Sequence, residues 1–290
     1  MGNSNGSKFK NYLSLVKFSH TIFAMPFALI GLFLAYKTTP ISFSWQLLGL
    51  VILCMVFARN AAMSFNRLVD RYIDEKNPRT AEREIPKGII SAKSALLFII
   101  LNSILFIVTT WFINNLVFYL SPIALAVILL YSFTKRWTIL CHMVLGLGLS
   151  LAPIGAYLSV TGKFDIIPIL YSFIVLFWVG GFDIIYSLQD EEFDKNESLK
   201  SIPAALGIKN ALWVATAFHI ITALIVIYVG YKLDASSWYW AGAILFIALL
   251  VYQHSIINPK DIKRVNLAFA TTNGFASIIF AIFNILNFLL

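Results

Sequence analysis

Long apolar runs take up most of this chain and decide what it can fold into. Nine of them are long enough to cross about 30 Å of hydrocarbon as a helix, which takes about twenty residues. Lipid offers no hydrogen-bond partners, so each span must pair all of its backbone groups within the protein. Because no run shows the alternation of a membrane β-strand, each is predicted to be a helix. The predicted spans are 18–37, 45–65, 94–113, 116–133, 138–160, 166–188, 210–230, 238–257 and 265–288.

The composition agrees with an all-α, polytopic membrane protein. Apolar residues make up 59% of the chain and charged residues only 12%, about half the share usual in soluble proteins. A net charge of +8 would suggest nucleic acid as a partner of a soluble protein, but here the basic residues lie in short loops between spans. We therefore expect a protein that contacts membrane lipid and binds no nucleic acid. Residues 1–16 are expected to be a cytosolic tail, and residues 17–290 a single transmembrane domain around a central cavity that opens to the cytosolic side.

The basic residues also predict an orientation. In the nine-span arrangement, nineteen Lys and Arg side chains lie on the side of the N-terminus, and only Lys37, Lys163 and Lys232 lie opposite. Because loops rich in Lys and Arg stay in the cytosol, the N-terminus is predicted to be cytosolic. An odd number of spans then places the C-terminus outside.

Carboxylates are concentrated in two stretches at predicted span ends. NRLVDRYIDEKNPRTAEREIPKG, residues 66–88, holds five of them, and DIIYSLQDEEFDKNE, residues 183–197, holds six, which makes eleven of the fourteen in the chain. Both stretches emerge on the predicted cytosolic side. One such group alone is typical of a solvated span end, but two groups that face each other near lipid repel and need compensation.

The spacing within each stretch places oxygen atoms on one helical face. The first stripe follows i, i+4, i+8 and the second follows i, i+3, i+7, i+11. Such all-oxygen ligands favour Mg²⁺, which in turn shares its shell with phosphate oxygens, so we expect two ions and a diphosphate. The first stripe consists of Asn66, Asp70 and Asp74, and the second of Asp183, Tyr186, Asp190 and Asp194.

Basic residues near both stripes suit an anionic ligand. Arg favours bidentate phosphate contacts and Lys favours contacts as a point charge; the alternative is that these residues serve only to set topology. Arg59 lies inside the span 45–65, seven residues before Asn66 and about 10 Å deeper on the same face. An Arg within a span needs an anionic partner unless it snorkels to the interface. The residues that follow the stripes are Arg79, Arg83, Lys87, Lys195 and Lys200.

The two stretches resemble the signature of a known family, the UbiA superfamily of intramembrane prenyltransferases. The second stretch, followed by KSIPAALG, is similar to the family's other Asp-rich motif, and the resemblance covers nearly the whole chain. One departure is Arg67, since many members have Asp after the Asn. The matching positions of the first stretch are Asn66, Asp70, Asp74, Arg79, Thr80, Arg83 and Gly88.

The resemblance implies Mg²⁺-dependent transfer of a polyprenyl group from its diphosphate to an aromatic carboxylic acid in quinone biosynthesis, in a bacterial inner membrane. The implied metal ligands are Asn66, Asp70 and Asp74 for one ion and Asp183, Asp190 and Asp194 for the other. Asp70, Asp74, Asp190 and Asp194 are also the expected catalytic residues, together with Tyr186, which would stabilise an allylic cation. The expected diphosphate ligands are Arg79, Arg83, Lys87, Lys195 and Lys200, and the expected acceptor ligands are Arg59, Lys17 and His20.

The acceptor stays open between two aromatic compounds, with a haem or a glycerol-phosphate lipid as less favoured alternatives. The wording DIIYSLQD and the position of Arg59 are most similar to the 4-hydroxybenzoate polyprenyltransferase group, and we favour that acceptor. The same wording resembles enzymes of the futalosine route to menaquinone, whose acceptor is 1,4-dihydroxy-6-naphthoate. Both compounds carry a carboxylate, so Arg59 does not separate them. A transporter is disfavoured because its acids would lie at mid-membrane, and here they lie at span ends. Donor chain length and oligomeric state do not follow from the sequence.

Overall fold

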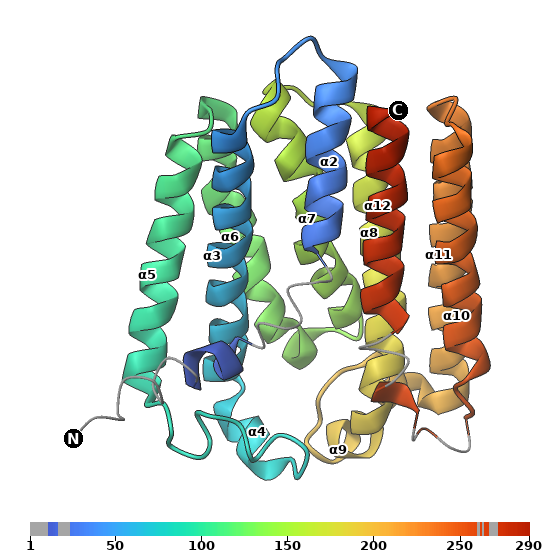
Figure 1. Ribbon diagram of the computed structural model, residues 1–290. Coiled ribbons are helices and arrows are strands. Elements are labelled where there is room, and N and C mark those ends of the chain that lie inside the picture. Colours follow the sequence, from blue (N-terminus) through green and yellow to red (C-terminus); the bar gives the residue numbers. More distant parts are fainter. Residues whose placement is uncertain (1–10, 17–23, 260–261, 263, 267–271) are drawn as a thin grey trace, which may run out of the picture.

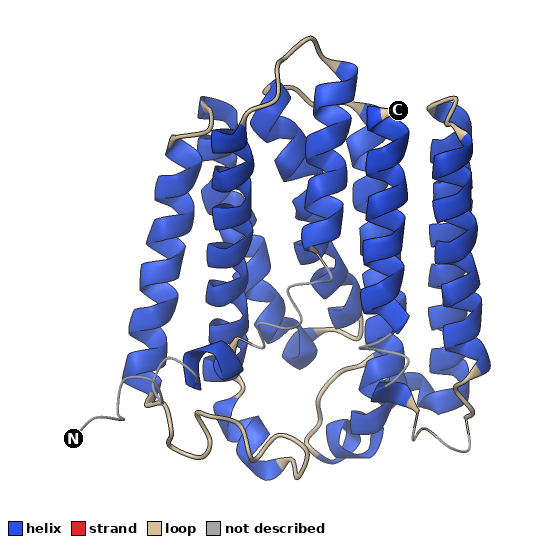
Figure 2. Ribbon diagram, viewed as in Figure 1, coloured by secondary structure: helices blue, strands red, loops and turns tan. Residues whose placement is uncertain are grey.

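The computed structural model describes residues 11–16, 24–259, 262, 264–266 and 272–290. These residues form helices joined by loops, as the apolar runs predict (Figures 1 and 2). The long helices are α2 (Met25–Thr38), α3 (Trp45–Val69), α5 (Ala92–Trp111), α6 (Asn115–Trp137), α7 (Cys141–Thr161), α8 (Ile166–Ser187), α10 (Ile202–Lys232), α11 (Ser237–Ser255) and α12 (Asn273–Leu289). The short elements are α4 (Arg71–Lys76), the 3₁₀ helix η2 (Leu188–Asp190) and α9 (Glu191–Asn196).

Six helical segments in the described residues are long and apolar enough to cross a membrane. They are α3, α5, α6, α7, the segment Ile166–Asn196 and α10, and α2 and α12 are shorter apolar helices. The chain is therefore an integral membrane protein. The count of nine crossings stays a prediction, because parts of the first and last predicted spans fall outside the described residues.

Polar residues between the apolar runs fix where the helices begin. A side-chain oxygen before a helix satisfies one of the N–H groups that the first turn leaves unpaired. Gly162, with φ of 61°, ends α7 in the left-handed conformation usual after a helix. The side chains that accept such a bond are Ser44 before α3, Ser91 before α5, Asn114 before α6, Asp165 before α8 and Ser201 before α10.

One half of the bundle is tightly packed. Helices α2, α7, α8, α10, α11 and α12 share a core of buried aromatic rings, in which Phe246 lies 4.8 Å from Phe280 and 5.9 Å from Trp178 between ring centroids. The backbones of α2 and α7 also approach closely, because a Cβ atom on Gly31 would lie 2.0 Å from the carbonyl oxygen of Pro153. Small residues permit such contacts between helices in lipid.

The other half surrounds a cavity. Helices α3, α5, α6 and α7 line most of a cavity of about 740 Å³, to which α8 adds residues near one end. This end, where α4 and α9 lie at the bottom of Figure 1, is called the carboxylate end below. The C-terminal residue Leu290 lies at the opposite end of the bundle. α7 and α8 belong to both halves, so the tightly packed half forms one wall of the cavity.

Candidate active site

Both acidic stretches lie where a long helix gives way to a short one. α3 ends at Val69, and Asp70, with φ of −88° and ψ of 3°, separates it from α4. α8 ends at Ser187 and continues through η2 into α9. The single continuous helical face expected for the first stripe is thus interrupted at Asp70. The six predicted metal ligands nevertheless line the same cavity: Asn66, Asp70, Asp74, Asp183, Asp190 and Asp194.

Arg79 joins the two stretches. Its Nε and Nη2 atoms donate to the two oxygens of Asp190 at 3.0 and 2.6 Å, and its Nη1 donates to the Tyr186 hydroxyl at 2.9 Å. Asn77 donates to the same carboxylate at 3.1 Å. Burial lowers the pKa of Arg79, but the Asp190 carboxylate outweighs that effect, so its pKa is raised and the guanidinium stays charged. A residue predicted to bind diphosphate is therefore positioned by an acid of the second stretch.

The acids of the first stretch are paired in the same way. Arg83 Nη1 lies 2.8 Å from both oxygens of Asp74, and Arg136 Nη2 lies 2.8 Å from Asp70 Oδ1. Asn66 donates to the other oxygen of Asp70 at 3.0 Å. Burial raises the pKa of Asp70, and the ion pair with Arg136 offsets only part of that effect. A second cation near Asp70 would favour its charged form.

The remaining acids have partners on α6 and α7. Lys135 Nζ lies 2.8 Å from Asp194, to which Ser201 also donates at 2.8 Å. His142 Nδ1 donates to Asp183 at 2.7 Å, and its Nε2 accepts from the backbone N–H of Ile202 at 3.3 Å. Each of the five aspartates thus has a basic partner at the cavity.

Three of these partners were not predicted as site residues. From the sequence, Lys135 and Arg136 are expected only to set topology, and no role is predicted for His142. One sequence feature could have identified Lys135 and Arg136 as site residues. They form a basic pair at the end of a span, and the residues that connect it to the next span, 138–140, contain no acid that could pair with them. His142 gave no signal, since a single His at the start of an apolar helix is usually a packing residue.

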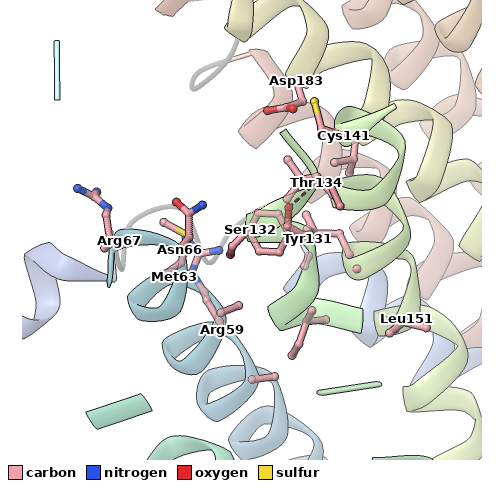
Figure 3. Close-up of a pocket in the computed structure, with 18 of the residues that line it drawn as sticks. Arg59, Met63, Asn66, Arg67, Tyr131, Ser132, Thr134, Cys141, Leu151 and Asp183 are labelled. Atoms are coloured by element: carbon pink, nitrogen blue, oxygen red, sulfur yellow. Dashed lines mark hydrogen bonds between the residues drawn. The ribbon is translucent and has the colours of Figure 1, made fainter. Parts of the chain in front are cut away.

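Arg59 lies on the cavity wall further from the carboxylate end. Figure 3 shows Arg59 and Asn66 on α3 across the cavity from Tyr131 and Ser132 on α6. The predicted common face of Arg59 and Asn66 is thus present. Tyr186 also lines the cavity, and its ring centroid lies 5.3 Å from the guanidinium carbon of Arg79.

The other predicted ligands are not brought to the cavity. Lys87 pairs with Glu82, Lys195 pairs with Glu191 at 2.5 Å, and Lys200 donates to the Trp137 carbonyl at 3.1 Å. None of these three lysines lines the cavity. The two remaining acceptor candidates, Lys17 and His20, lie outside the described residues.

Arg67, the departure from the family pattern, is at the cavity. Its side chain is only 3% exposed, and its Nη1 lies 3.7 Å from Glu84 Oε2. Ser14 donates to the other oxygen of Glu84 at 2.5 Å. The position that carries an acid in many members thus holds a buried cation, which an acid from the following loop compensates.

The donor atoms fit Mg²⁺ in kind, although they form no ready-made cage. Among the described residues, no three His, Cys, Asp or Glu side chains converge closely enough to hold a metal ion. Mg²⁺ keeps several waters and takes phosphate oxygens, so one or two carboxylates from each stretch are enough. The site therefore suits ions that arrive together with a phosphorylated ligand.

Comparison with known families agrees with this geometry. The model of the UbiA prenyltransferase family matches residues 24–281, which is most of the chain. The chain belongs to the UbiA prenyltransferase family. The expected membership of this family is thereby confirmed.

Relatives and solved structures of the family agree in length and fold. The 4-hydroxybenzoate octaprenyltransferases of Aliivibrio salmonicida and Aliivibrio fischeri (strain MJ11) are 32% and 30% identical to this chain, with 86% of each chain covered in both comparisons. A UbiA homolog from Aeropyrum pernix K1, solved in the apo state, has a TM-score of 0.84 at 29% identity and covers 92% of this chain and 97% of its own. A homolog from Archaeoglobus fulgidus, solved bound to GPP and Mg²⁺, has a TM-score of 0.69 at 24% identity, with coverage of 92% and 99%, and shares the fold.

Proposed function

We propose that this protein transfers a polyprenyl group from polyprenyl diphosphate to 4-hydroxybenzoate in a Mg²⁺-dependent reaction of quinone biosynthesis. One observation carries the proposal: a single cavity combines five aspartates and their basic partners at one end with an apolar interior and Arg59 between them. The ends of the cavity match the two ends of the donor. The names of the curated relatives support 4-hydroxybenzoate as the acceptor.

The carboxylate end would hold the diphosphate. Asn66 with Asp70 and Asp74 would hold one Mg²⁺ ion, and the three aspartates of the second stretch would hold the other. When bound, Mg²⁺ supplies positive charge that stabilises the departing diphosphate. Arg79 and Arg83 now donate to Asp190 and Asp74, so each has to exchange a carboxylate contact for a phosphate contact. Arg is suited to both ligands because its donors match planar pairs of oxygens.

Departure of the diphosphate leaves an allylic cation, and a carbon of the acceptor ring attacks it to form the new C–C bond. That ring carbon then loses its proton to a base, which restores the aromatic ring. The Tyr186 ring and its hydroxyl, which Arg79 holds, line the cavity beside Asp183 and Asp190 and stabilise that cation. The Arg59 guanidinium binds the acceptor carboxylate further inside. The apolar wall excludes water, which would otherwise capture the cation.

The first test is a membrane assay with radiolabelled octaprenyl diphosphate, Mg²⁺ and either 4-hydroxybenzoate or 1,4-dihydroxy-6-naphthoate, with and without EDTA. We expect an EDTA-sensitive product from hydroxybenzoate. A product from the naphthoate alone would contradict the proposed acceptor and support the menaquinone route. No product from either acceptor would contradict both assignments.

The role of Arg59 has its own test. Arg59→Ala should raise the KM for 4-hydroxybenzoate at least about tenfold, because a charge-assisted hydrogen bond contributes about 1.5–3 kcal/mol. Arg71→Ala is the matched control, since Arg71 does not line the cavity and donates to the Leu68 carbonyl at 2.7 Å. An unchanged acceptor KM with a raised donor KM would move Arg59 to the diphosphate.

A further inference from the structure

The turn between α10 and α11 carries a second pocket, at the end of the bundle opposite the carboxylate end (Figure 1). It lies beside the last turn of α12, because the backbone N–H and the hydroxyl of Ser236 both donate to Asn287 Oδ1 at 2.8 Å. None of its lining residues lines the large cavity. Its volume is about 370 Å³, within the range of small-molecule sites, and its lining residues are Gly230, Tyr231, Asp234, Ala235 and Trp240.

Two aromatic rings form walls of this pocket. The ring centroids of Tyr231 and Trp240 lie 5.1 Å apart, and the ring planes are inclined by 64°. Trp240 packs close to α10 because Gly230 has no side chain, since a Cβ atom there would lie 2.8 Å from the indole Cη2. Tyr231 is exposed, so much of its ring is accessible to a ligand. The faces of Trp and Tyr rings attract organic cations, and this pocket offers one of each.

Asp234 adds a carboxylate to the pocket, in a backbone conformation that Gly adopts most easily. The end of α10 is closed by hydrogen bonds from the Ala235 N–H to the Gly230 carbonyl at 3.0 Å and from the Asp234 N–H to the Tyr231 carbonyl at 3.2 Å. This motif requires a left-handed residue after the helix, and Asp234 has φ of 47°. At the end of α7, on the same side of the bundle, Gly162 has that conformation. An Asp in its place indicates that the side chain is used.

The charges of the turn complement a zwitterionic headgroup. Asp234 is exposed and forms no ion pair with any described residue, so its carboxylate is available to an ammonium group that lies against the two rings. Lys232 is also exposed and also forms no such pair, and it supplies a cation for a phosphate. The turn directly follows a membrane-spanning helix, which places it at the level of lipid headgroups.

Apolar surface continues from the pocket along both helices towards the middle of the membrane. On α10, Leu224, Tyr228 and Tyr231 follow i, i+4, i+7 and therefore share one exposed face. On α11, the exposed Ile244 lies one turn below Trp240. Acyl chains that hang from a headgroup in the pocket would cover these side chains, whereas a free cation would leave them uncovered. The surface thus favours a lipid over a soluble cation.

We propose that the pocket binds a phospholipid whose headgroup carries an ammonium group, as phosphatidylethanolamine and phosphatidylcholine do. The ammonium group lies against Tyr231 and Trp240 and pairs with Asp234. The phosphate contacts Lys232, and the acyl chains follow the exposed faces of α10 and α11. Phosphatidylglycerol has the phosphate but no cation, so the pocket should discriminate against it. Because the pocket is separate from the cavity, this proposal does not depend on the proposed function.

The test is native mass spectrometry of the full-length protein in detergent, titrated with phosphatidylethanolamine, phosphatidylcholine or phosphatidylglycerol of the same acyl chains. The wild type should bind each ammonium lipid at least about threefold more tightly than phosphatidylglycerol, as a partly exposed cation–π contact predicts. Asp234→Asn and Tyr231→Leu should each lose most of this preference. Soluble phosphocholine, which lacks acyl chains, should compete at least about tenfold more weakly than phosphatidylcholine binds, and equal affinity would overturn the assignment to a lipid.

The variant Asp234→Gly separates ligand binding from folding. Gly adopts φ of 47° without strain, so this variant should unfold at the wild-type temperature or above it while it loses the lipid preference. Tyr231→Phe keeps the ring and should keep the preference. Asp165→Asn changes an acid before α8 at the same end of the bundle, and it should bind all three lipids as the wild type does.

Two results would overturn the proposal. One is equal binding of the three lipids by the wild type, and the other is a wild-type preference that persists in both Asp234→Asn and Asp234→Gly.

Discussion

The two acidic stretches lie at the same end of one cavity but obtain their counter-charges differently. The first stretch supplies much of its own positive counter-charge, since Arg83 pairs with Asp74 nine residues away and Arg67 lies beside Asn66. The three aspartates of the second stretch rely on other segments: Arg79 from the first stretch, Lys135 from α6 and His142 from α7. The second stretch is thus the more anionic wall. From this difference we expect it to contribute more to cation binding than the first.

The largest expected effect tests this ranking directly. Asp190→Asn should lower kcat at least about 10³-fold, and Asp70→Asn about 10²-fold, because an electrostatic partner of the transition state is commonly worth these factors. Each variant keeps the shape of the side chain and leaves its basic partner in place. The measurement is prenyl transfer at saturating donor and fixed Mg²⁺.

Asp165→Asn is the control for both variants. Asp165 caps α8 by accepting from the backbone N–H of Ile167 at 3.0 Å, away from the cavity, and Asn caps a helix equally well. Its activity should stay within about twofold of the wild type. A greater loss in Asp70→Asn than in Asp190→Asn would reverse the ranking of the two stretches.

An intermediate effect is expected at Arg67. Arg67→Gln removes a buried positive charge from the first stretch, so the Mg²⁺ concentration for half-maximal activity should fall severalfold, as about 1 kcal/mol of charge repulsion predicts. The measurement is a Mg²⁺ titration of prenyl transfer in both proteins. Arg71→Gln, outside the cavity, should leave the titration unchanged. Identical titrations of Arg67→Gln and wild type would show that Arg67 does not influence the ions.

The smallest effect is expected for the lysines that do not line the cavity. Lys87→Ala and Lys195→Ala should each change the donor KM by less than about twofold, because exposed ion pairs contribute about 0–1 kcal/mol. Lys135→Ala is the comparison, since Lys135 lines the cavity and pairs with Asp194. A tenfold rise in donor KM for either exposed lysine would mean that these loops close over the diphosphate.

Much of the fold was predictable from the sequence because each helix is a local property of an apolar run between capping residues. The predicted span 45–65 and helix α3, for example, begin at the same residue, which Ser44 caps. The start of α10 was missed by eight residues. It includes a bend at Gly207, whose φ of 75° and ψ of 163° are accessible almost only to Gly, and no apolar pattern reveals such a bend.

The acids of the site were also predictable, but most of their partners were not. Asp70 and Arg136 are 66 residues apart, and Arg79 and Asp190 are 111 apart. Spacing rules apply within one helix and do not say which distant cation meets which carboxylate. The sequence therefore located the acids, whereas the pairing required the arrangement of the helices.

The order of these charges along the chain has a consequence for biogenesis. Arg79, Arg83, Lys135 and Arg136 are all synthesised before the second stretch, whose acids pair with two of them. While the ribosome is still making α7 and α8, Arg79 and Lys135 lack those carboxylates and remain as surplus cations beside apolar helices. Surplus cations of this kind retain a loop on the cytosolic face during insertion. We therefore expect these two side chains to help orient the nascent protein in the membrane first and to pair with the acids at the cavity later.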